Sequence, residues 1–256
     1  LPMEYYPPIT NAIRYLGEQS DIQTLAISSE NEKGRPAYSN ERIRLLRFRT
    51  GRPIDSLLKR WRNTLSWHWQ AATAISNFRP DVLLYFEPHS ALAATLYYRW
   101  FKGTSRLFIH HHEYYTPSDY RQPGNRLTRI NHFFECRTLF GRADWISQTN
   151  TDRLRLFQKD HPQIRAQSLY AMPNFPPKSW GTCENIHRDD FGSPTLKLVY
   201  VGSLSLHDTY IGPLVEWLLE HPDCGMTLDI FAYNTDPTTR KFLNTINGNI
   251  VRFHDT

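Results

Sequence analysis

The sequence predicts an α/β protein made of two doubly wound, parallel-sheet domains that face each other across a cleft, with the second domain incomplete. Two observations lead to this fold class. Short apolar runs typical of buried strands alternate with helical periodicity through residues 1–175. The same alternation restarts after a stretch rich in proline and glycine, beginning with the apolar run from Leu196 to Val201.

The elements of the first domain follow from local signals. Pro7 and Pro8 favour a helix start, and Ile9, Ile13 and Leu16 fall on one face of that helix. The elements predicted after it are strands at 21–28 and 43–48, a helix at 54–78, a strand at 81–86, a helix at 91–100, a strand at 106–112, a helix at 126–140, a strand at 144–148, a helix at 151–159 and a strand at 168–172. This alternation implies right-handed crossovers and a parallel sheet.

The second domain begins with a strand, a turn and a helix. Residues 196–201 form the strand, and the small-residue sequence at 202–205 predicts a sharp turn. A helix follows, with four apolar residues at i, i+3, i+4 and i+7: Ile211, Leu214, Val215 and Leu218. Two more strands are predicted, at 227–233 and 249–253. A helix N-terminus behind such a turn attracts anions, because its free N–H groups and its dipole point at the ligand.

These patterns set the domain boundaries. We place the first domain at 1–175, a linker at 176–194 and the start of the second domain at 195–256. The first domain lacks the strand with which such a domain normally opens, and the second has only three predicted strands. We therefore expect residues at both ends of the protein to be missing from this sequence. An open parallel sheet of three strands should bury its faces poorly.

Composition excludes several classes of protein. A hydrophobic content of 40% excludes a disordered chain, and no apolar run is long enough to predict a transmembrane helix. The three cysteines, at 136, 183 and 224, are scattered without metal-ligand spacing, which favours reduced thiols in a cytoplasmic protein. No Asp-x-Asp pair occurs, so a substrate site bridged by a metal on paired aspartates is not supported. We expect no cofactor and no required metal.

Charge is divided unevenly between the domains. Residues 1–180 carry a net charge of +10 and residues 181–256 a net charge of −5. The densest basic cluster runs from Arg42 to Arg62, with Trp61, Trp67 and Trp69 beside or within it. Basic residues with neighbouring tryptophans suit an anionic membrane surface, and the alternative is a solvated basic helix. Helical spacing predicts that Trp61 and Trp69 face the core, which leaves Trp67 and the charges for peripheral contact with the inner face of the cell membrane. No nucleic-acid partner is expected.

Four segments carry a family resemblance. Residues 169–176 (LYAMPNFP) look like the strand and hinge that leave an acceptor domain, and residues 198–204 (LVYVGSL) look like the strand and glycine turn that open a donor domain. His111-His112-Glu113 resembles the "HE" pair at a strand tip, and residues 143–149 (ADWISQT) look like the strand that follows. The chain thus resembles the GT-B glycosyltransferases, whose two domains are Rossmann-like. It is most similar to the retaining group of bacterial polysaccharide and lipid-linked glycan enzymes.

The resemblance implies a catalytic pair, His112 and Glu113. Alternation along a strand places His110 and His112 on one side and His111 on the other. At the strand's carboxyl end, His112 is expected to bond a sugar hydroxyl or accept its proton, with Glu113 orienting the ring. Two alternatives stay open: a structural histidine, and a metal site made by His110, His112 and Glu113.

The implied donor and acceptor residues come from strand ends and loops. The expected nucleotide-sugar donor site consists of Gly202, Ser203, Leu204, Ser205, Tyr233 and Phe253, the two aromatic residues flanking the base. The expected site for the glycan or lipid-linked acceptor consists of Tyr5, Tyr6, Glu87 and His89. Each has a structural alternative: the glycine as a simple turn, the donor aromatics as core caps, the tyrosines as domain packing, and Glu87 with His89 as a helix cap.

These patterns leave more than one function open. The first is a glycosyltransferase that uses a nucleotide-sugar donor. The second is a non-catalytic binding or partner subunit of the same fold, which the absence of Arg or Lys shortly after Gly202 favours. The third is a nucleotide-sugar epimerase of the same two-domain architecture.

Overall fold

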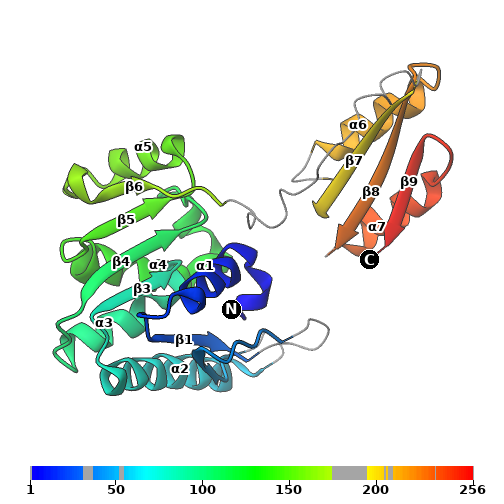
Figure 1. Cartoon of the computed structure of the whole chain (residues 1–256). Helices are drawn as coiled ribbons and strands as arrows, with labels where there is room; N and C mark the ends of the chain where they lie inside the picture. The colour runs from blue at the N-terminus through cyan, green and yellow to red at the C-terminus, as the bar shows by residue number, and fades with distance from the viewer. Residues whose placement is uncertain are drawn as a thin grey trace. The chain divides into compact units, whose positions relative to one another are not determined.

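The described residues of the first part of the chain form six parallel strands in two sheets (Figure 1). The computed structural model describes residues 2–30, 37–51, 55–174, 195–204, 206, 210–233 and 235–255. The chain divides into two units, Leu1–Thr182 and Cys183–Thr256. The linker predicted at 176–194 lies outside the described residues.

The two sheets of the first unit are all parallel, as predicted. β1 (Thr24–Ser29) pairs with β2 (Ile43–Phe48). The second sheet has the order β3-β4-β5-β6, formed by Val82–Phe86, Arg106–His111, Trp145–Gln148 and Leu169–Ala171. Within the described residues, β1 and β3 are not hydrogen-bonded to each other, so the first unit departs from a single continuous sheet.

The larger core cluster among the described residues of this unit lies on one face of the four-stranded sheet, and a smaller one joins Met3, Ile13, Ala26 and Ile43. Leu107 and Ile109 of β4 and Ile146 of β5 are completely buried because alternation directs them to the same side. Residues of helices α2 (Leu57–Phe78), α3 (Ala91–Arg99) and α5 (Thr151–Asp160) pack against them. The remaining helical segments are η1 (Met3–Tyr5), α1 (Pro7–Glu18), η2 (Pro88–Ser90), η3 (Asp119–Arg121), η4 (Pro123–Asn125), α4 (Arg126–Phe134), the π-helical turn η5 (Glu135–Leu139) and η6 (Ala166–Ser168).

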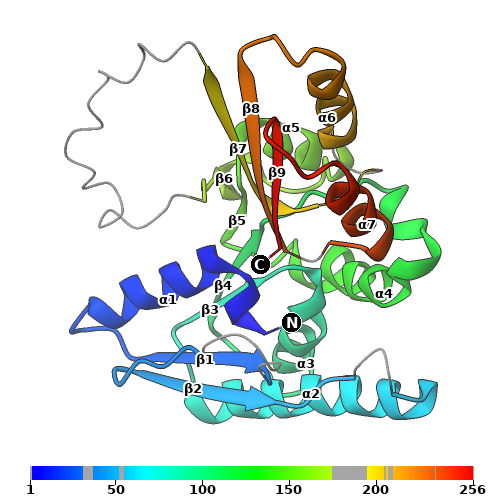
Figure 2. The ribbon, with the colours of Figure 1, turned by 90° about the vertical axis from the view of Figure 1, so that its right-hand side faces the viewer.

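The long helix α2 differs from the sequence prediction in which side chains it buries. Its C-terminal half packs inward through Ala72 and Ile75, and Figure 2 shows β1 and β2 lying along it. Trp61 and Trp69, predicted to face the core, are 37% and 46% exposed, whereas the indole N–H of Trp67 is buried. The apolar stripe along α2 is continuous, but the sheet formed by β1 and β2 covers only part of the helix. Among the helices of the described residues, none combines the length and apolar character needed to cross a bilayer.

The second unit is a three-stranded parallel sheet with one open face. Its order is β7-β8-β9, formed by Leu196–Ser203, Met226–Tyr233 and Val251–Asp255, and helices α6 (Ile211–Glu220) and α7 (Pro237–Ile246) share one core cluster with it. On the other face, Val199 and Val201 are 62% and 73% exposed. Parallel sheets usually bury both faces, but here α6 and α7 bury one face and leave the other exposed, so the expected poor burial holds for one face of the described sheet. Within the described residues, helices cover only one face of this sheet.

Candidate functional site

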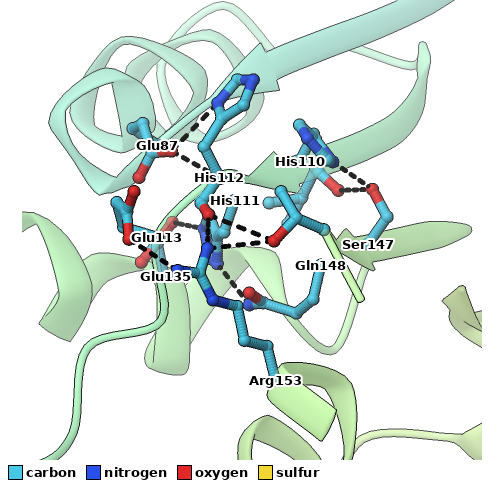
Figure 3. Close-up of polar contacts among 11 residues, drawn as sticks. Glu87, His110, His111, His112, Glu113, Glu135, Ser147, Gln148 and Arg153 are labelled. Carbon is cyan, nitrogen blue, oxygen red and sulfur yellow. Dashed lines mark hydrogen bonds and ion pairs between the residues drawn. The ribbon is translucent and has the colours of Figure 1, made fainter. Parts of the chain in front are cut away.

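The candidate site lies where β3 and β4 end, next to each other (Figure 3). Glu87 follows β3 and His112 follows β4, and both are largely buried. One carboxylate oxygen of Glu87 accepts the backbone N–H of His112 at 2.6 Å and lies 3.1 Å from the Nδ1 atom of the same residue. The carboxyl ends of parallel strands are where ligands bind in open α/β sheets, so this pair is in the expected position.

The backbone of Glu87 is held in an unusual conformation. Its φ of 61° and ψ of 152° lie in a region that only glycine adopts readily, at a cost of about 1–3 kcal/mol for other residues. Its N–H donates to the carbonyl of His110 at 3.0 Å, and Pro88 follows it. This conformation turns the carboxylate toward the end of β4, where it reaches His112. Strain of this kind is concentrated at functional sites in proteins.

The pairing sets the hydrogen-bonding character of His112. A carboxylate only accepts hydrogen bonds, so Nδ1–H is the donor to Glu87. In the neutral ring, Nε2 is then left with its lone pair, and among the described residues this buried nitrogen has no hydrogen-bond partner. The ring stacks on Phe86, with centroids 5.6 Å apart. The imidazole is therefore oriented from one side and able to accept a proton or a hydrogen bond on the other.

His110 lies on the same side as His112, as alternation predicted. Their ring centroids are 4.5 Å apart, and His110 Nδ1 lies 2.6 Å from the hydroxyl oxygen of Ser147, its register partner on β5. Burial, together with the neighbouring histidines His112 and His111, lowers the pKa of His110 to about 3. His110 is thus a neutral, hydrogen-bonded ring beside the site. Within the described residues, His110, His112 and Glu113 do not bring three ligand atoms together for a metal.

The expected role of Glu113 is corrected. We predicted that Glu113 orients His112, but its carboxylate lies 3.1 Å from the guanidinium of Arg153 and is 61% exposed. The chain turns directly after β4, which directs Glu113 away from the His112 ring. Arg153 also donates to the backbone carbonyl of His112. Glu87, predicted to contact the acceptor, is the residue that orients His112. The ion pair between Glu113 and Arg153 stabilises the turn that follows β4.

His111 points to the opposite face, where sequence reasoning missed its partner. Its Nε2 lies 3.0 Å from a carboxylate oxygen of Glu135, which is completely buried and also accepts the hydroxyl of Tyr85 at 2.9 Å. Burial acts to raise the pKa of Glu135, but His111 and His132 outweigh it and lower this pKa to about 2. Burial acts to lower the pKa of His111, and the charge of Glu135 reverses this and raises it. This face is a buried structural network.

Of the other expected acceptor residues, Tyr6 lies beside the pair and His89 contacts α4. Tyr6 is half-buried with its ring centroid 6.0 Å from that of His112, and burial followed by the charge of Glu87 raises its pKa to about 12. His89, in η2, has its Nε2 atom 3.2 Å from the hydroxyl oxygen of Thr128. The side chain of Tyr5 lies outside the described residues. Tyr6 is thus placed at the edge of the site, while His89 is engaged with α4.

The structure places two of the expected donor residues in a strand rather than in a turn. Gly202 and Ser203 lie within β7, paired with Ala232 and Tyr233 of β8, so the strand runs two residues past its predicted end, into the predicted turn. Leu204 is 1% exposed in the core of the unit. Ser205 and the side chains of Ser203 and Tyr233 lie outside what the structure describes.

Phe253 is also a core residue. It is 7% exposed and belongs to the same cluster as the two helices, because β9 continues to Asp255 and places it within the strand rather than at its end. The structural alternative for Phe253, a core side chain, is therefore the one observed. Its ring is not at the strand tip, where a nucleotide base was expected to bind.

Comparison with known proteins identifies the fold. The sequence matches no protein-family model and no curated protein. Solved structures do match. The α,α-trehalose-phosphate synthase (UDP-forming) from Burkholderia vietnamiensis aligns with a TM-score of 0.62 at 10% identity, over 97% of this chain and 70% of that one. Sucrose-phosphate synthase from Thermosynechococcus elongatus aligns with a TM-score of 0.61 at 12% identity, over 96% and 64%.

An epimerase shares the fold as well. A putative UDP-N-acetylglucosamine 2-epimerase from Listeria monocytogenes aligns with a TM-score of 0.53 at 11% identity, over 83% of this chain and 54% of that one. The chain therefore has the GT-B fold, as the sequence predicted, and its structural neighbours are glycosyltransferases and epimerases of that fold. It spans 54% and 64% of the length of the Listeria epimerase and the sucrose-phosphate synthase.

Proposed function

We propose that the protein is a hexosyltransferase-type glycosyltransferase that moves a sugar from a nucleotide-sugar donor to a glycan or lipid-linked acceptor in bacterial surface polysaccharide synthesis. The observation that carries the proposal is His112, held through Nδ1 by the strained Glu87 with Nε2 free of any described partner. No metal or cofactor takes part in the proposed transfer. The fold and its neighbours, which include glycosyltransferases, support the assignment.

The proposed chemistry gives each residue a task. His112 Nε2 accepts a hydrogen bond or a proton from a sugar hydroxyl, and Glu87 stabilises the positive charge that then develops on the ring. Tyr6 lies beside this ring and offers a surface for a sugar. The transition state of glycosyl transfer is oxocarbenium-like, and the departing diphosphate needs electrostatic capture. We assign that capture to the N-terminus of α6, where free backbone N–H groups and the helix dipole favour an anion.

Calorimetry with a nucleotide sugar and with its free diphosphate tests the donor site and the contact between His112 and the sugar. We expect the protein to bind one of the uridine, guanosine or adenosine diphosphates together with its sugar conjugate. His112→Ala should weaken binding of the sugar conjugate by about 2- to 10-fold, the value of one hydrogen bond, and leave the free diphosphate unaffected.

A matched control is His221→Ala, a histidine that stacks on Trp217 at the end of α6. It should change neither affinity. Absence of binding to all three diphosphates would reject the donor site. An equal loss of affinity for conjugate and diphosphate in His112→Ala would reject the contact between His112 and the sugar.

The epimerase is a second candidate, because solved UDP-N-acetylglucosamine 2-epimerases share the fold at TM-scores of 0.53 and 0.55. An epimerase inverts a carbon of the nucleotide sugar without an acceptor. Incubating the protein with UDP-N-acetylglucosamine alone and following the C2 proton by NMR separates the two. Conversion to the C2 epimer supports the epimerase. Binding without epimerisation, and without transfer to any tested acceptor, supports the non-catalytic partner subunit.

A lipid-linked acceptor requires access to a membrane, and we propose that α2 provides it as a peripheral contact. Leu58, Trp61, Leu65 and Trp69 form an exposed stripe 37–84% accessible, flanked by exposed basic residues including Arg60. Each basic residue near an anionic surface contributes about 1 kcal/mol, and the contact should weaken with salt.

Cosedimentation with anionic and neutral vesicles at low and high salt tests this contact. We expect the protein to bind anionic vesicles at low salt and the double variant Trp61→Ser, Leu65→Ser to bind less. The control Trp217→Ser removes a tryptophan of similar exposure, 41%, from the second unit. Equal binding to both vesicle types, or none to either, would leave α2 as an ordinary solvated surface.

A further inference from the structure

Three potential metal ligands meet on the first unit, away from the pair formed by Glu87 and His112. They are His132 in the last turn of α4, Cys136 in the π-helical turn η5, and His161 directly after α5. One ligand atom from each lies within 4.8 Å of the others, and Cys136 is exposed. His132 and Cys136 are four residues apart on one helical face, but His161 comes from a separate element, so sequence spacing predicted no site here.

The closest contact already has the geometry of a metal site. His132 Nε2 and Cys136 Sγ are 3.4 Å apart. In a tetrahedral zinc site with Zn–N of about 2.0–2.1 Å and Zn–S of about 2.3 Å, neighbouring ligand atoms are about 3.3–3.6 Å apart. Because the three ligand atoms lie within 4.8 Å of one another, the remaining contacts need to shorten by at most about 1.5 Å to reach these values.

The surroundings hold the two imidazoles in place. The carboxylate of Glu135 lies 3.2 Å from His132 Nδ1, which fixes the hydrogen on that nitrogen and leaves the Nε2 lone pair directed at the thiol. A carboxylate behind a histidine in this way is the usual outer partner of a zinc ligand. Tyr120 stacks on the His132 ring with centroids 3.9 Å apart and an angle of 4°.

His161 is positioned by packing alone. Its ring lies against those of Phe157 and Phe140, at 4.7 and 5.1 Å between centroids. Among the described residues, neither of its ring nitrogens has a hydrogen-bond partner, while the ring of His132 lies 5.3 Å away. Two imidazoles and a thiol thus lie side by side.

We propose that His132, Cys136 and His161 bind a zinc ion, with solvent at the fourth position. Two imidazoles and one thiolate are ligands that zinc prefers, and exposure of Cys136 leaves the fourth position open to water. The ion would tie the end of α4 and the turn η5 to the end of α5. This departs from the expectation that the protein holds no metal, and it is independent of the proposed transfer reaction.

Zinc content and cobalt spectroscopy of the purified protein test the site. After loading with zinc and dialysis, we expect one zinc per chain. Substituted with Co²⁺, the protein should show a thiolate-to-cobalt charge-transfer band and the intense visible bands of a four-coordinate ion. Cys136→Ser and His161→Asn should each lower zinc affinity by more than about 100-fold, because loss of an outer hydrogen-bond partner alone costs about 10- to 100-fold.

Cys224→Ser is the matched control, since it removes a cysteine of the second unit that lies outside the cluster. It should keep the zinc and the cobalt band, and zinc should raise the Tm of this control but not of Cys136→Ser. The cobalt measurement needs no variant, so it decides the matter even if a substitution prevents folding. No charge-transfer band in the unmodified protein, or equal zinc content in Cys136→Ser and Cys224→Ser, would overturn the proposal.

Discussion

Replacing Glu135 by glutamine tests the electrostatics of the buried network behind β4. The carboxylate is fully buried and lies 2.9, 3.0 and 3.2 Å from its partners Tyr85, His111 and His132. Burial acts to raise its pKa, but the two imidazoles prevail and lower the pKa from 4.5 to about 2. At about 1.4 kcal/mol for each pKa unit, the network favours the ionised carboxylate by about 3 kcal/mol.

The sign of the pH dependence follows from this shift. Because the pKa of Glu135 is lower in the folded than in the unfolded protein, its stabilisation is complete above about pH 4.5 and is lost as the pH falls through about 2. The raised pKa of His111 acts oppositely, with stabilisation that is lost as the pH rises through that pKa. Near pH 6 both contribute, so Glu135→Gln should lower the free energy of unfolding by about 3 kcal/mol there.

Urea denaturation from about pH 2 to pH 7, with a chelator present to exclude metal effects, measures this difference. The difference in the free energy of unfolding between the variant and the unmodified protein should fall toward zero at the lowest pH. Asp229→Asn is the control, because Asp229 pairs with Arg252 and His254 at a partly exposed position in the second unit. A difference in the free energy of unfolding that stays constant with pH would refute the electrostatic explanation. A variant as stable as the unmodified protein near pH 6 would refute it too.

Three further predictions concern packing and protonation. Gly103→Ala should lower stability by about 1–3 kcal/mol, since its Cβ would lie 2.2 Å from a ring carbon of Tyr97, whereas Gly141→Ala, with no atom within 4 Å, should be neutral in the same thermal denaturation. Leu107→Ala should cost about 2–5 kcal/mol in chemical denaturation because this side chain is completely buried, and a loss below about 1 kcal/mol would contradict that burial. The ring of His110, with its pKa lowered to about 3 by burial and by neighbouring histidines, should stay neutral in nitrogen NMR spectra from neutral pH down to about 4, and protonation near 6.5 would contradict its buried position.

Much of the fold was predictable because strands and helices have local signatures. β2 was predicted with its observed bounds, Ile43–Phe48, and β4 to within one residue. The facing of the three histidines was also predictable, since successive side chains of a strand alternate between its faces. His110 and His112 share one side and His111 takes the other, as the structure confirms.

The partners of those histidines could not be predicted. Glu87 precedes His112 by 25 residues, and Glu135 follows His111 by 24. Sequence reasoning chose the adjacent Glu113 for His112, but the turn after β4 directs it to Arg153. The backbone conformation of Glu87, which decides the pairing, has no sequence signature in a residue that normally avoids it.

By itself, the sequence determined the order of the elements, the parallel pairing and the sides to which His110, His111 and His112 point. These properties depend on backbone periodicity and on which residues avoid water, both of which are local. Only the tertiary structure decided that the Trp61 side of α2 stays exposed, that Phe253 lies in a core, and that His161 meets His132 and Cys136. Those outcomes depend on how far a sheet extends under a helix and on where separate elements end. Neither property can be deduced from the amino acids at these positions, because both depend on residues distant in the sequence.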